Sequence, residues 1–125
     1  MDGSVQERKR VVEAYFEGFR SGDHEAILAC LTDDVVWEIV GHRRLQGKAE
    51  FDSEIESDRF EGHPELAVES LTGEGERVVA LGRGLGRLRG GGELRFAFCT
   101  AFELTAANAI ASVTSYIVPL DQGSD

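Results

Sequence analysis

The sequence has few cysteines and prolines, and it has no long hydrophobic run. Its two cysteines, Cys30 and Cys99, both lie in apolar patterns far apart in the chain. This placement favours buried, reduced thiols over a disulfide scaffold. No stretch approaches the roughly 20 apolar residues of a membrane-spanning helix, and the basic residues near the amino terminus precede no apolar run. We therefore expect a cytoplasmic protein with no membrane partner.

Basic residues are also scarce. The chain has 13 Lys+Arg against 23 Asp+Glu, which gives a formal net charge of -10. A field of this sign repels phosphate backbones, so we expect no nucleic-acid partner. With 125 residues, 42% of them hydrophobic, the chain can fill one core but not two, and we expect a single domain over residues 1–125.

Metal-binding and phosphate-binding motifs are missing as well. His24, His42 and His63 do not have the spacing of metal ligands, so no metal and no cofactor are expected. The run Gly82-Arg83-Gly84-Leu85-Gly86 resembles a phosphate-binding loop, but such a loop needs a helix after it. Here the strand pattern continues, which favours glycines that let a strand bend or another segment approach closely.

The first third of the chain predicts two helices and a strand. Apolar residues from Val11 to Phe19 recur on one helix face, and Ser21-Gly22-Asp23 supplies a C-cap glycine followed by an N-cap aspartate. The second helix is short and ends at Thr32-Asp33-Asp34. The β-branched and aromatic run from Val35 to Val40 then predicts a strand.

The remaining two thirds predict one more helix and a run of strands. After a polar turn, a third helix is expected from Lys48 to about Phe60, ended by Gly62-His63-Pro64. Its inner face would carry Phe51, Glu54, Ile55 and Asp58. From Leu66 the hydrophobic period changes toward two, which predicts four successive strands: Leu66–Leu71, Arg77–Arg89, Glu93–Leu104 and Ala109–Val118.

One long segment carries a family resemblance. The run from Val12 to Trp37, VEAYFEGFRSGDHEAILACLTDDVVW, with Gly47-Lys48 after it, resembles the opening of the nuclear transport factor 2-like superfamily. Within it, the chain is most similar to the SnoaL-like and ketosteroid-isomerase-like group. The resemblance implies an α+β, cone-shaped fold, in which three helices from the first half of the chain pack on a curved mixed or antiparallel sheet and enclose a pocket.

The catalytic residues of two relatives of this group are only partly present. Compared with ketosteroid isomerases, Tyr15 stands at the oxyanion-hole tyrosine, Ile39 at the general-base aspartate and Thr100 at the protonated aspartate. An isoleucine cannot accept a proton, so that isomerase mechanism is not supported. Compared with limonene-epoxide-hydrolase-like enzymes, Arg83 matches the arginine of the water-activating group, and Ser115 replaces one of its carboxylates.

The same epoxide-hydrolase comparison shows three further replacements. Leu85 takes the place of the second carboxylate, and Trp37 and Ile39 replace the tyrosine and asparagine that would hold the water. The family frame is therefore retained while its proton-carrying residues are not.

The resemblance also sets which residues should face the pocket. We expect Tyr15 and Glu54 to be the catalytic candidates, Tyr15 as an oxyanion donor and Glu54 as the proton carrier. Tyr15 could instead be a core tyrosine, and Arg83 could pair with Glu54 or Asp58 or hold a ligand carboxylate. The expected substrate-binding residues are Trp37, Ile39, Arg83, Phe98, Thr100 and Ser115, and the wall would also include Leu85, Phe102, Val113 and Ile117.

Two functions remain open on this reading. The first is a small-molecule pocket protein, possessing isomerase, hydrolase or cyclase activity on a mostly apolar, oxygenated substrate. The second is a non-catalytic ligand-binding or dimeric interaction module. A homodimer is expected through the outer sheet face, whose residues are small or weakly polar: Ala97, Cys99, Ala101, Ser112, Thr114 and Tyr116.

Overall fold

The computed structural model describes residues 2–55 and 60–120. Helices come first, and most of the strands follow. The elements in chain order are α1 (Asp2–Ser21), α2 (His24–Ala29), β1 (Leu31–Ile39), β2 (Arg43–Gln46), α3 (Lys48–Ile55), β3 (Phe60–Glu74), β4 (Arg77–Leu88), β5 (Glu93–Leu104) and β6 (Ile110–Pro119).

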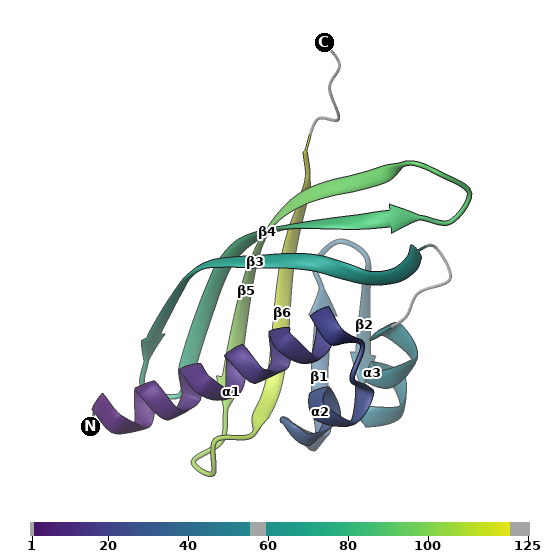
Figure 1. Ribbon diagram of the computed structural model, residues 1–125. Helices are drawn as coiled ribbons and strands as arrows, with labels where there is room; N and C mark the ends of the chain where they lie inside the picture. The colour runs from purple at the N-terminus through teal and green to yellow at the C-terminus, as the bar shows by residue number, and fades with distance from the viewer. Residues whose placement is uncertain (1, 56–59, 121–125) are drawn as a thin grey trace.

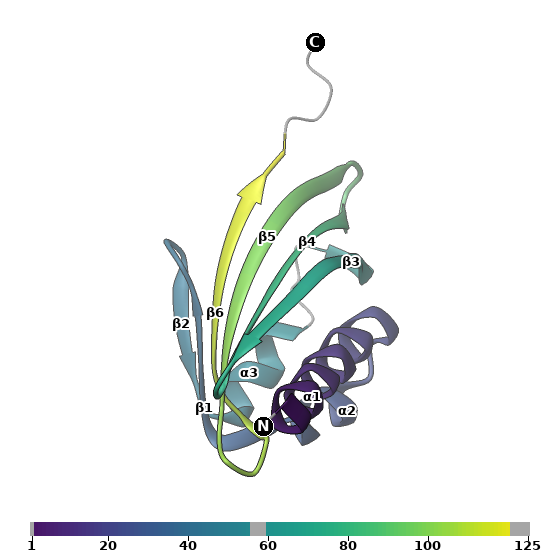
Figure 2. The ribbon, with the colours of Figure 1, turned by 90° about the vertical axis from the view of Figure 1, so that its left-hand side faces the viewer.

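The strands form one six-stranded mixed sheet in the order β2-β1-β6-β5-β4-β3. Strands β3 to β6 are an antiparallel meander, and β1 joins it by parallel pairing with β6. The sheet is strongly curved and open, with β2 and β3 at its two edges, and all three helices lie on its concave side (Figures 1 and 2). The expected α+β cone is confirmed.

The junction of the first two helices follows the sequence prediction. Gly22 adopts a φ of 70°, a left-handed conformation that disfavours side chains with a Cβ. Asp23 then caps α2, because its Oδ1 accepts a hydrogen bond from the Ala26 amide at 3.1 Å. This tight turn folds α2 back against α1. None of the described helices is both long and apolar enough to cross a membrane.

The core lies between the helices and the concave face of the sheet. Aromatic rings fill much of it: Tyr15 and Phe16 from α1, Phe51 from α3, and Phe98 and Phe102 from β5 are all buried. Tyr15 is 5.1 Å from Phe102 between ring centroids, and Phe16 stacks on Phe98 at 5.5 Å. These contacts connect α1 to the middle of the sheet.

Strand β2 was missed by the sequence analysis, which expected a polar turn there. Leu45 is its one buried residue and lies opposite Trp37 of β1. A four-residue edge strand with a single apolar position has no period-two pattern, so its pairing with β1 is decided by that one tertiary contact.

The boundaries of β1 and β3 also differ from the prediction. Strand β1 begins at Leu31, with a register irregularity before Val36. The predicted helix up to Phe60 is wrong at its end, because Phe60 belongs to β3 and its ring lies over Gly86 of β4, 2.9 Å from where a Cβ would stand. The expected position of Asp58 lies outside the described residues.

Candidate functional site

The centre of the concave face is a row of side chains that crosses the sheet from the β2 edge to β4. In the strand registers, Arg43 of β2 is opposite Ile39 of β1, Ile39 is opposite Ser115 of β6, and Ser115 is opposite Thr100 of β5. Ala80 of β4 follows Thr100 in the same row. Because paired residues in a sheet share a face, the five side chains line one wall. The sequence analysis brought Ile39, Thr100 and Ser115 to this wall.

Two of the polar groups near this row satisfy each other. The indole Nε1 of Trp37 donates a hydrogen bond to Ser115 Oγ at 3.1 Å, and both side chains are buried. Trp37 lies one position below Ile39 on the inner face, where its ring packs 4.5 Å from Phe51. The bond fixes the indole against the sheet and leaves the serine O–H free to donate, since Oγ here acts as the acceptor.

Tyr15 projects from α1 toward the same face. It is 3% exposed, and rings from three elements surround it, with centroids 5.0 Å away at Phe19, 5.1 Å at Phe102 and 6.2 Å at Phe51. Within residues 2–55 and 60–120, the Tyr15 hydroxyl makes no hydrogen bond to another residue. Burial is the main reason that the pKa of Tyr15 lies far above its usual value, and the charge of Cys30 adds to it. Tyr15 therefore stays a neutral donor.

Glu54 lies at the edge of this wall and is tied to a residue that the sequence analysis did not consider. Its Oε1 accepts a hydrogen bond from Arg43 Nη1 at 2.9 Å. The Glu54 side chain is 21% exposed and that of Arg43 is 58% exposed. Phe51, one turn earlier on α3, is fully buried against Trp37. The helix thus fixes Glu54 beside the row, where solvent can reach it.

Phe98 lies on the inner face, as expected, and its position explains one glycine. A Cβ at Gly82 would stand 2.6 Å from the Phe98 ring and 2.2 Å from the Ala67 carbonyl oxygen. Gly84 has a similar relation to the Phe96 ring, at 2.4 Å. The glycines of β4 therefore give neighbouring aromatic rings room on the concave face, which agrees with the interpretation against a phosphate-binding loop.

Arg83 and Leu85 do not lie on the inner face, and the expectation that they line the pocket is wrong. Arg83 is paired with Ala97 in the register, on the opposite side of the sheet from Gly82 and Phe98. Its side chain is 65% exposed, and its Nε is 3.4 Å from Glu69. Alternation along β4 sends glycines inward and Arg83 and Leu85 outward, so neither can contact a ligand on the concave face.

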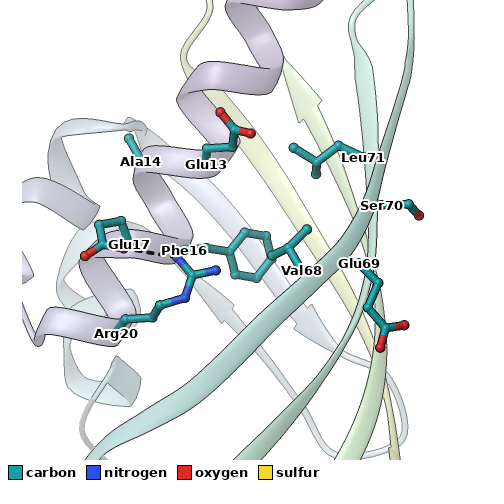
Figure 3. Close-up of a pocket in the computed structure, with 9 residues that line it drawn as sticks. All are labelled: Glu13, Ala14, Phe16, Glu17, Arg20, Val68, Glu69, Ser70 and Leu71. Carbon is teal, nitrogen blue, oxygen red and sulfur yellow. Dashed lines mark hydrogen bonds and ion pairs between the residues drawn. The ribbon is translucent and has the colours of Figure 1, made fainter.

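The structure has a groove in a place that the sequence analysis did not anticipate. It has a volume of about 620 Å³ and lies between α1 and the edge strand β3, outside the row described above (Figure 3). Phe16, Val68 and Leu71 give it an apolar floor, while Glu13 and Arg20 stand at its sides. None of the eight predicted site residues, all of which are described, lines it.

A signal for each missed feature was present but weak. Glu13, Glu17 and Arg20 are spaced i, i+4 and i+7, which places them on one face of α1 beside the apolar stripe. Which strand lies across the groove from these residues depends on the order of the strands in the sheet. The sequence pattern does not give that order. Arg43 could be placed on the inner face only after β2 had been recognised as a strand.

Among the described residues, no group of three or more His, Cys, Asp or Glu side chains could hold a metal ion. Both cysteines are free thiols, and burial raises the pKa of Cys30. The chemistry that this wall offers is therefore hydrogen-bond donation from Tyr15, Ser115 and Thr100, together with a carboxylate and a guanidinium at its edge.

An open, curved sheet with three helices packed on its concave side is the architecture of the cone-shaped α+β class, whose members are small-molecule pocket proteins. Residues 12–113 match the model of the SnoaL-like domain family, and the chain belongs to that family. Its fold is that of the nuclear transport factor 2-like and ketosteroid-isomerase-like group, so the resemblance found in the sequence is confirmed.

Three solved structures illustrate the similarity. A candidate polyketide cyclase from Xanthomonas campestris pv. campestris is 26% identical, with a TM-score of 0.82 and coverage of 90% of this chain and 91% of that one. An LEH-like epoxide hydrolase from M. tuberculosis is 23% identical, with a TM-score of 0.80 and coverage of 90% and 84%. A nuclear transport factor 2-like protein from Burkholderia xenovorans LB400 is 21% identical, with a TM-score of 0.75 and coverage of 90% of each chain. No curated protein matches the sequence significantly.

Proposed function

We propose that this protein binds a small, mostly apolar, oxygenated molecule on the concave face and promotes an isomerisation, hydrolysis or cyclisation by proton transfer. The observation that carries the proposal is the Tyr15 hydroxyl, a neutral donor enclosed by aromatic rings without a protein partner in the described ranges. A hydroxyl surrounded by apolar rings gains free energy when another group accepts its hydrogen bond. A ligand oxygen would supply the acceptor.

Tyr15 would serve as the donor to a developing oxyanion. Hydrogen-bond donors in a site that excludes water stabilise negative charge more strongly than the same donors do in water. With its pKa raised by burial, Tyr15 keeps its proton, as a hydrogen-bond donor must. Thr100 and Ser115, both buried on the facing wall, would orient the rest of the ligand.

Glu54 would carry the proton. It is the one of the two proposed catalytic residues that can accept one, and it lies beside the row of Ile39 and Ser115 through its bond to Arg43. Two structural relatives support the class of substrate: one is described as a candidate polyketide cyclase and another as an epoxide hydrolase. Both descriptions name chemistry on oxygen-bearing carbon compounds. We propose that the protein acts in the cytoplasm.

Screening a panel of apolar epoxides and ketones, first by thermal shift and then by product formation, would test this function. Glu54→Gln should abolish turnover while the affinity for these neutral ligands stays within about twofold, because the amide keeps the shape but cannot take a proton. Glu38→Gln is the matched control, since Glu38 lies on the other face of β1 beside Ile39. Unchanged turnover in Glu54→Gln would end the catalytic proposal.

The convex face supports a second proposal, that of a homodimeric binding module. Leu81 is 46% exposed, Tyr116 is 49% exposed and Val118 is 58% exposed. Leu81 and Tyr116 flank Cys99 in the register of β4, β5 and β6, so they form a continuous apolar strip. Such a strip suits sheet packing against a second copy. Sedimentation should show a dimer that Tyr116→Asp converts to a monomer, and a wild-type monomer at micromolar concentration would exclude it.

A further inference from the structure

Arg43 lies at the β2 end of the central row, and only some of its hydrogen-bond donors have a partner. Arg43 Nη1 bonds Glu54 at 2.9 Å, and within the described ranges this carboxylate is its one polar partner. A guanidinium has five N–H donors arranged in a planar fork. One carboxylate oxygen at one nitrogen therefore leaves an edge of the fork open, and the 58% exposure of the side chain shows that solvent reaches it.

The surroundings of Arg43 are unusual for this protein. The chain has a formal net charge of -10, yet His42, Arg43 and Arg44 follow one another in the exposed turn and strand that close the concave face on this side. An acidic protein repels anions at long range, so an anion can be held only by local cations with suitable geometry. The segment His42-Arg43-Arg44, from the β1–β2 turn into β2, offers such a group.

Apolar side chains lie on the same face of the sheet as Arg43. Ile39, opposite Arg43, is half-buried, and Ile117, one inward position farther along β6 than Ser115, is 39% exposed. A flat apolar body could rest on these two side chains while an anionic group at its end reaches the guanidinium. This arrangement resembles the usual composition of small-ligand sites, in which a few polar groups fix an apolar molecule.

We propose that Arg43 forms an anion subsite on the concave face, oriented by Glu54, and that it selects ligands with a carboxylate at one end of an apolar body. The carboxylate would take the unused edge of the fork in two parallel hydrogen bonds while Glu54 keeps Nη1. The inference rests on the proposed function, since it adds a substrate class to that same wall. In this proposal Arg43, which lies on the concave face, binds the ligand carboxylate that the sequence analysis had considered for Arg83.

A matched pair of compounds tests the subsite directly. Binding of 2-naphthoate and of its neutral isostere 2-naphthamide to the full chain would be measured by calorimetry at low salt. We expect about a tenfold preference for the carboxylate, which corresponds to about 1.4 kcal/mol. Arg43→Met should remove the preference with little change for the amide, and Arg43→Lys should keep only part of it because an ammonium lacks the fork. Arg44→Met, adjacent but opposite Glu38 on the other face, should keep it.

A second variant separates the subsite from a structural ion pair. Glu54→Gln removes a negative charge beside the bound carboxylate, so naphthoate should bind a few-fold more tightly while naphthamide is unchanged. Equal affinity for the two compounds in the wild type, or a preference that survives Arg43→Met in a variant with an unchanged melting temperature, would overturn the subsite but leave the proposed function standing. Binding of neither compound would also overturn the subsite, whereas the proposed function would be decided by the panel of epoxides and ketones.

Discussion

The two faces of the same sheet differ in what the strand alternation brings together. On the concave face, β4 presents glycines under the rings of Phe96 and Phe98. On the convex face, Arg83 of the same strand pairs with Glu69, in an ion pair largely open to water. At this part of β4 the concave face therefore depends on close packing, and the convex face carries a weak, screened ion pair. Substitutions of neighbouring residues on β4 should therefore differ sharply in how much they lower the free energy of unfolding.

The largest effect is expected at Gly82. Its Cβ would stand 2.2 Å from the Ala67 carbonyl oxygen, a backbone atom that cannot move without breaking the pairing of β3 with β4. Gly82→Ala should lower the free energy of unfolding by about 3 kcal/mol through overpacking. Urea denaturation would measure it. A cost below about 1 kcal/mol would mean that the two faces are equally tolerant.

Burial of Tyr15 should make stability depend on alkaline pH. Its pKa is raised in the folded protein, so the stabilisation is fully present below the unfolded value of about 10 and is lost as pH rises above it. Between pH 9 and 11 the wild type should lose about 1.4 kcal/mol more than Tyr15→Phe, one pH unit above the unfolded pKa. Parallel denaturation series would show the difference, and identical pH slopes would mean that the hydroxyl is not buried.

How far the sequence could define the site depends on the strand. In β5 the alternation of Phe96, Phe98 and Thr100 with small residues identifies the inner face from the pattern alone. In β4 the inner positions after Ala80 are glycines, which carry no hydrophobic signal, and Arg83 and Leu85 were placed inward from the family resemblance. The register with β5 decides the matter, because Arg83 lies opposite Ala97, and register is a tertiary property.

The helices show a similar division between local and tertiary information. The Gly22 and Asp23 junction was predicted, because capping depends on local backbone and side-chain chemistry. The partner of Glu54 was not, because Arg43 lies on a short edge strand that only its pairing with β1 defines. The groove beside Phe16 depends on β3 being the sheet edge. Both features depend on the order and pairing of the strands. Local sequence patterns do not reveal that order.

The hydrogen bond between Trp37 and Ser115 should have a moderate effect. Trp37→Phe and Ser115→Ala each remove one partner of a buried bond of 3.1 Å. The single variants should cost about 1–3 kcal/mol because each leaves a buried polar group unsatisfied or loses packing. In a double-mutant cycle the two changes should couple by about 1 kcal/mol. Strict additivity would show that the bond contributes nothing to the wall.

The smallest effect is expected at Arg83, which makes it the matched control for Gly82. Arg83→Ala removes an exposed pair with Glu69, and such pairs contribute about 0–1 kcal/mol, less at high salt. The free energy of unfolding should change by no more than about 0.5 kcal/mol, and the affinity for 2-naphthoate should not change, since this side chain lies on the face opposite the proposed site. A tenfold loss of naphthoate binding in Arg83→Ala would reverse the assignment of the two faces, because an exposed convex arginine has no route to a ligand on the concave wall.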